Sequence, residues 1–188
     1  MLLSEHKALK LEIKSLPEKE KDKLLLRLIA KDKVLTEHLH FKLLEDEQDM
    51  AIRHEQLLKG IDQGIAELNV AKRPNSKEAL LKMRKLNGNI NHHFKVTKDL
   101  NSEIELRIHL LINIPVDFDE SIYSSLYKFN EKLLVYFVKT TSAVLNKYYK
   151  MHDDLQFDLK SSLNILLTKI YHHKTAAIAK TLGLPEQL

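Results

Sequence analysis

Two groups of side chains in the sequence have the types and spacing that could do chemistry. The first is Glu37-His38-Leu39-His40, a Glu-x-x-His motif on a predicted helix. In ferritin-like proteins this motif holds a metal together with a second copy and two further glutamates from other helices. The sequence contains no second copy. We therefore predict that Glu37 and His40 lie on a solvated helix face and that the chain has no metal site.

The second group is a set of basic side chains on a helix predicted over residues 77–95. At 100° per residue they lie opposite the apolar positions of the same helix. We call this set the basic face, and it consists of Lys77, Arg84, Lys85, His92 and Lys95. Such a face could contact the phosphates of a nucleic acid. It lacks aromatic residues for stacking and side chains arranged for base reading, so a solvated charged surface is the competing interpretation.

Other signatures of chemistry are missing from the sequence. There is no glycine-rich phosphate loop, no nucleophile elbow, and no cysteine for a thiolate nucleophile or a zinc site. The adjacent pairs His92-His93 and His172-His173 are poor chelators, because neighbours on a helix point about 100° apart. We therefore predict a protein that is not an enzyme, with no cofactor and no evident small-molecule substrate.

The composition indicates the fold class. Four glycines and four prolines among 188 residues, with 44% hydrophobic and 30% charged residues, are typical of an all-α protein. The length suits one core, so we predict a single all-helical domain over residues 1–188. No stretch approaches 18 uncharged apolar residues, and cysteine is absent, so we expect a cytoplasmic protein without a membrane segment.

The predicted elements are arranged around one long helix at about 118–150. Apolar residues recur at steps of three or four from Ile122 to Tyr148, and the run Leu133 to Val138 is apolar at all six positions. We predict that Asp117 and Glu120 cap the start of this helix. Whether it breaks near His152 is left open by the pattern. Around it we expect an irregular bundle or a short α-superhelix of seven to nine helices in all.

Local capping signals divide the rest of the chain. A Ser, Asp or Asn that precedes an apolar helical pattern predicts a helix start, because its side chain can accept from a free backbone amide. The predicted caps are Ser15, Asp32, Asp46, Asn75 and Asp99.

Three segments resemble parts of a family of uncharacterised all-helical bacterial proteins. They are Leu16-Pro17-Glu18-Lys19-Glu20 with Leu24 to Lys33, then Lys77 to Asn89, and finally His152 to Asp158. The resemblance implies an α-helical fold and no known activity, and it carries over no functional residue.

The net charge of +4 is concentrated in one region. Eight Lys and Arg stand against the single Glu78 between Ala71 and Lys98, whereas Met1 to Gly60 carries twelve of each sign. We predict a non-enzymatic helical interaction or scaffold protein that binds a protein partner or itself. The alternative is a nucleic-acid-binding accessory protein that uses the basic face.

Overall fold

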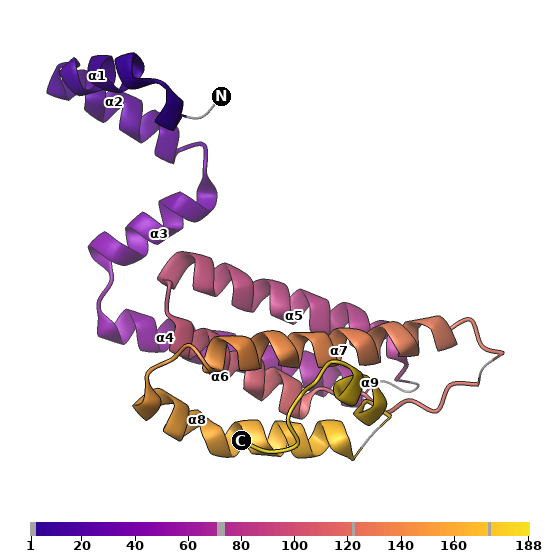
Figure 1. Cartoon of the computed structure of the whole chain (residues 1–188). Coiled ribbons are helices and arrows are strands. Elements are labelled where there is room, and N and C mark those ends of the chain that lie inside the picture. The colour runs from indigo at the N-terminus through magenta and orange to yellow at the C-terminus, as the bar shows by residue number, and fades with distance from the viewer. Residues whose placement is uncertain (1–2, 71–73, 122, 173) are drawn as a thin grey trace. The chain divides into compact units, whose positions relative to one another are not determined.

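The computed structural model describes residues 3–70, 74–121, 123–172 and 174–188. In these ranges it contains nine α-helices and no strand, which confirms the all-α prediction (Figure 1). The chain divides into two compact units, Met1–Glu45 and Asp46–Leu188, and each is described by itself. A single domain over residues 1–188 stays a prediction.

Unit 1 consists of short helices. Its elements are a 3₁₀ turn Leu3–Glu5, α1 Lys7–Ser15, α2 Glu18–Ile29 and α3 Lys33–Leu44. Asp32 caps α3 as predicted, because its carboxylate accepts from the Leu35 amide at 3.1 Å. The predicted Ser15 cap is wrong. Ser15 donates its hydroxyl to the Glu12 carbonyl at 2.8 Å, and Pro17 precedes α2 without a side-chain hydrogen bond.

Unit 2 is a helical bundle. Its elements are α4 Glu47–Val70, α5 Ser76–Thr97, α6 Leu100–Asn113, α7 Tyr127–Tyr148, α8 Asp153–Tyr171 and α9 Ala176–Thr181. The predicted caps Asp46, Asn75 and Asp99 each accept from a backbone amide in the first turn of α4, α5 and α6. These three helix starts are therefore confirmed.

The centre of this bundle is α6. It packs against α4, α5, α7 and α8, and Figure 1 shows it running between its neighbours. Ile104, Leu106, Leu110 and Leu111 are all 0% exposed. A helix that is apolar on several sides must be covered on several sides, and α6 meets that condition more fully than the long helix expected to be central.

The predicted long helix over 118–150 is shorter than expected. Helix α7 begins at Tyr127, and residues 115–121 are not helical. Buried and less buried residues alternate here instead, with Ile114, Val116 and Phe118 buried. This period of two is that of an extended backbone, which buries every second side chain. Ile122 from the predicted apolar stripe lies outside the described residues.

The predicted cap by Asp117 and Glu120 is wrong, because α7 begins at Tyr127 after Leu126, and Glu120 has a different partner. Its carboxylate accepts from the Ser76 amide at 2.9 Å and from the Ser76 hydroxyl at 2.6 Å. The Glu120 carboxylate therefore lies at the N-terminus of α5, where the helix dipole favours a negative charge, and it does not cap the helix that follows Glu120 in the chain.

The open question near His152 is answered by a break. Helix α7 ends at Tyr148, and α8 begins at Asp153. His152 precedes α8, where its Nδ1 accepts from the Asp154 amide at 3.4 Å. Across the parts of the chain described here, we find no helix that is both long enough and apolar enough to cross a lipid bilayer.

Candidate functional site

The basic face is exposed, as predicted, but its members lie in different surroundings. Lys77 Nζ lies 5.4 Å from the Phe129 ring centroid, and Arg84 Cζ lies 5.4 Å from the Tyr136 centroid, so both lean over α7. Lys85 lies on the other flank of α5, beside Glu67 of α4. The structure thus divides the set between two helix interfaces. Cation–π contact with α7 gives two of these cations a structural role.

This division leads to a prediction about nucleic acids. We expect no binding of duplex DNA tighter than about 10⁻⁴–10⁻⁶ M at physiological salt, the non-specific range. Fluorescence anisotropy with labelled duplex DNA measures the dissociation constant. Submicromolar binding with a salt slope of about −3.6, from roughly −0.9 for each of four phosphates, would contradict this expectation. Loss of that binding on changing Lys77, Arg84, Lys85 and Lys95 to Gln would then assign it to the basic face.

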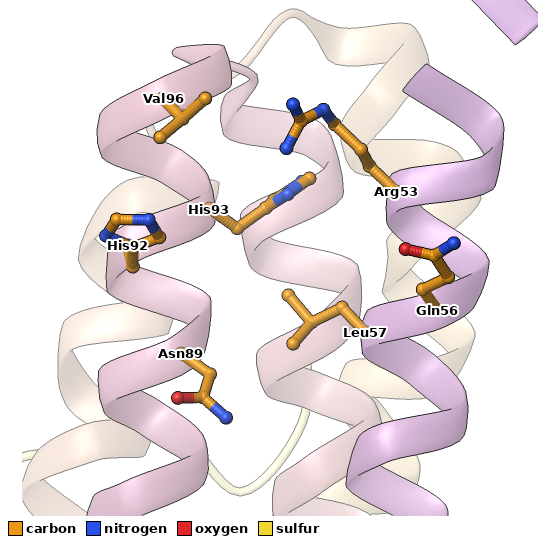
Figure 2. Close-up of a pocket in the computed structure, with 7 residues that line it drawn as sticks. All are labelled: Arg53, Gln56, Leu57, Asn89, His92, His93 and Val96. Carbon is orange, nitrogen blue, oxygen red and sulfur yellow. The ribbon is translucent and has the colours of Figure 1, made fainter. Parts of the chain in front are cut away.

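His92 lines a pocket between α4 and α5. The pocket has a volume of about 340 Å³ and is lined by Arg53, Gln56, Leu57, Asn89, His92, His93 and Val96. Figure 2 shows the Arg53 guanidinium and the His93 ring reaching toward one another from the two helices, with Leu57 and Asn89 below them. The lining therefore combines two apolar side chains, Leu57 and Val96, with side chains that can donate hydrogen bonds.

One hydroxyl next to His93 joins two imidazoles. Ser102 Oγ lies 2.8 Å from His54 Nδ1 and 3.0 Å from His93 Nε2. Ser102 is in the first turn of α6 and is only 3% exposed. A hydroxyl can donate to one neutral imidazole and accept from another, so the three groups satisfy one another when both rings are neutral.

The surroundings of His93 favour its neutral form. Burial lowers the pKa of His93 below its usual 6.5, and the charges of His54 and Arg53 lower it further, while Asp99 and Glu103 oppose this. Within the described ranges, no group of three His, Asp or Glu side chains could hold a metal ion.

A second polar cluster joins α5, α6 and α7. The Glu103 carboxylate is 0% exposed and accepts from Arg107 at 2.8 Å and from Lys147 at 2.6 Å. Arg107 also donates to Asn87 at 3.1 Å and to Asn91. Lys147 Nζ lies 4.7 Å from the ring centroid of Phe94 on α5. Each charge of the cluster has a partner, so this cluster holds three helices together.

Lys169 on α8 closes the C-terminal end of α6. Its ammonium donates to the carbonyl oxygens of Leu111, Ile112 and Ile114 at 3.0, 2.8 and 2.5 Å. Carbonyls at the end of a helix lack partners in the helix, and a cation there also suits the dipole. Burial lowers the pKa of Lys169 from 10.5 to about 8, against an opposing effect of Asp117.

We expect Lys169→Met to lower the free energy of unfolding by about 1–3 kcal/mol, because three carbonyls lose their donor. Urea melts at pH 7 measure the loss. Between pH 8 and 10.5 the unfolded chain binds more protons than the folded chain at this lysine. The free energy of unfolding of the unsubstituted protein minus that of the Lys169→Met variant should therefore rise from pH 8 to 10.5. If this difference stays constant or falls with pH, the pKa of Lys169 is not lowered.

The Glu-x-x-His motif of α3 has a local explanation. His40 Nδ1 lies 2.8 Å from Glu45 Oε1, five positions along the chain, and the His40 side chain is 59% exposed. The solvated face remains our interpretation of this motif.

Helices α1 and α2 carry exposed leucines. Among the described residues of α1, α2 and α3 none is buried. Several leucines of α1 and α2 are exposed by between 39% and 67% of their surface. We call these residues the leucine face, and they are Leu9, Leu11, Leu24, Leu25, Leu26 and Leu28.

Comparisons of the chain with protein-family models, with curated proteins and with solved structures found no match. The resemblance to a family of all-helical proteins therefore stays a prediction.

Proposed function

We propose that the chain is a non-enzymatic interaction protein that self-associates through the leucine face of α1 and α2. The single observation that supports this most is the exposure of six leucines on two helices without one buried residue. Single apolar residues on a surface are ordinary, but several exposed leucines on two consecutive short helices are typical of an interaction site.

Helix length supports the proposal. Helix α1 has 9 residues and α2 has 12. Isolated helices shorter than about 12–15 residues are marginal in water, and most helical stability comes from packing an apolar face. These two helices need such packing, and their own unit buries none of their residues.

The leucine run of α2 shows how much cover is needed. Leu24, Leu25, Leu26 and Leu28 are 39%, 56%, 65% and 54% exposed. At 100° per residue they spread over about 200° of the helix circumference, which is more than one neighbouring helix can cover. A cover for α2 must therefore come from at least two directions.

A second copy of the chain meets this requirement. Two copies of α1 and α2 supply four helices, the number from which many bundles build a core. Two-fold dimers are the commonest oligomers, and they pair the same surface of both subunits. The charges permit it, because Glu18, Glu20 and Asp22 alternate with three lysines, so that copies meet without one dominant sign. We place this self-association in the cytoplasm, where a chain without cysteine needs no oxidising compartment.

Light scattering on a size-exclusion column tests the proposal. The expected mass is twice the 21.9 kDa of one chain at high protein concentration. Changing Leu25 and Leu28 to Glu should reduce the measured mass to that of one chain, because unpaired charges buried in the dimer interface are costly. The matched control is Leu81→Glu with Ile165→Glu in unit 2, two residues with the same 55% exposure. A monomer without substitutions, or a control that dissociates equally, would overturn the proposal. So would a stable complex with a different protein in place of the dimer.

A further inference from the structure

The N-terminal part of α4, residues 47–60, buries little apolar surface. The buried residues of α4 are Ile61, Gly64, Ile65 and Leu68, and all of them lie beyond this part. Leu57 and Leu58 are half-buried and pack against the core. A segment with so few buried contacts opens more easily than the rest of a domain. The polar contacts of the N-terminal part therefore count for more in holding it on the bundle.

His54 makes such a contact, and it shares its partner with a second histidine. Ser102 Oγ on α6 lies 2.8 Å from His54 Nδ1 on α4 and 3.0 Å from His93 Nε2 on α5. The His93 ring extends from α5 toward α4 (Figure 2). One hydroxyl thus connects the N-terminal part of α4 to both helices that lie beneath it.

The hydroxyl limits how many protons the two rings can carry. When both rings are neutral, it donates to one ring and accepts from the other. When one ring is protonated, that ring donates to Ser102 Oγ, and the hydroxyl hydrogen still has the neutral ring as its acceptor. When both rings are protonated, both can only donate to the same oxygen, and two positive charges share one partner. Ser102 is 3% exposed and His93 is 7% exposed, so water screens this repulsion poorly.

The charged groups on the neighbouring elements do not offset a second positive charge. From α4, Arg53 acts on His93 with the same sign as a protonated His54. Asp99, which precedes α6, and Glu103 on α6 act in the opposite direction. The Asp99 carboxylate already accepts from two backbone amides, and the Glu103 carboxylate is paired with cations of α6 and α7.

We propose that His54, Ser102 and His93 form a pH-sensitive latch, which holds the N-terminal part of α4 on α5 and α6 and releases it when both rings are protonated. Release exposes Leu57 and Leu58, so the chain gains apolar surface in mild acid. The latch lies within unit 2 and does not depend on self-association through the leucine face.

The direction of the pH dependence follows from linkage. Burial, His54 and Arg53 lower the pKa of His93 below 6.5 in the closed form. In the open form the ring is in water and regains its ordinary pKa. Between the lowered pKa and 6.5 the open form therefore binds more protons than the closed form. Opening becomes easier as the pH falls through this window, and it is independent of pH well above 6.5.

Amide hydrogen exchange followed by NMR at one low protein concentration tests the latch. Each measured rate is compared with the intrinsic exchange rate at the same pH, which removes the direct effect of pH on exchange. We expect the protection of residues 51–60 to fall between about pH 7.5 and about pH 5, by up to about tenfold per pH unit for each additional proton that the open form binds. The amides of residues 104–111 in α6 should keep their protection, because α6 is buried within unit 2.

Three variants assign the effect to the two rings. His54→Gln and His93→Gln each remove one titrating ring and leave an amide that can bond Ser102, so each should remove most of the pH dependence. The matched control is His109→Gln. His109 on α6 also contacts α4, but its partner is the carboxylate of Asp62, so this variant should leave the pH dependence of residues 51–60 unchanged.

A second measurement reads the coupling of the two rings directly. His54→Gln should move the titration midpoint of the His93 ring signals to higher pH, because it removes a positive charge that lowers the pKa of His93. The proposal is wrong if this midpoint stays the same, or if the protection of residues 51–60 does not depend on pH. It is also wrong if α6 loses protection in parallel, if either His54→Gln or His93→Gln keeps the full pH dependence, or if His109→Gln abolishes it. If a variant does not fold, the exchange of the unsubstituted protein with pH still decides.

Discussion

Changing Leu133 or Phe137 to Ala should lower the free energy of unfolding by about 2–5 kcal/mol, because each leaves a cavity that the bundle cannot fill. Both side chains are 0% exposed on α7, which packs against α5 and α6. Urea melts followed by circular dichroism measure the loss.

Val135 on the same helix is the control for these two changes. It belongs to the same apolar run but is 37% exposed, so Val135→Ala should cost much less. Losses below about 1 kcal/mol for both Leu133→Ala and Phe137→Ala would mean that α7 does not help to form the core.

Glu103→Ala should be comparably destabilising, with an expected loss of about 3–5 kcal/mol, the usual cost of removing one partner from a buried ion pair. The carboxylate is fully buried and accepts from both Arg107 and Lys147, so its removal leaves two cations facing each other without a counter-ion. The free energy of unfolding from urea melts is the measured quantity.

The exposed pair of Glu67 and Lys82 provides the matched control. Its two atoms lie 2.5 Å apart, but the Glu67 side chain is 54% exposed, and water can replace the lysine. Glu67→Ala should therefore leave the urea midpoint nearly unchanged. If Glu103→Ala and Glu67→Ala lower the free energy of unfolding equally, burial of the Glu103 cluster contributes nothing to stability.

Features that depend on a few neighbouring residues could be predicted from the sequence. The caps at Asp32, Asn75 and Asp99 were correct because a capping side chain and the amide that it accepts from lie within one turn. The exposure of the basic face also followed from local periodicity. The stripe predicted for α7 was correct over its last six members for the same reason, because each is buried or half-buried. They are Phe129, Leu133, Phe137, Thr140, Val144 and Tyr148.

Features set by residues far apart in the sequence could not be predicted. Glu120 was expected to cap the helix that follows it, but its partner Ser76 is 44 positions away. The alternation of Ile114, Val116 and Phe118 was an available signal of extended backbone directly before the helical pattern.

The candidate pocket shows the same limit. His92 could be placed on an exposed face, but its proximity to Arg53 depends on how α4 packs on α5. The link from His54 to Ser102 spans 48 positions. Glu103 and Arg107 are separated by four positions and could have been found as a helical ion pair, whereas Lys147 is 44 positions from Glu103.

Amide hydrogen exchange of residues 18–29 at low and high protein concentration tests self-association through the leucine face most directly. A short helix without buried residues opens easily, so its amides should exchange quickly in a single chain. If a second copy covers α2, protection of these amides should rise with concentration over about a hundredfold range, by mass action. The amides of α6 should show no such dependence, because α6 is buried within unit 2. Protection of α2 that is the same at every concentration, whether strong or absent, would contradict the account.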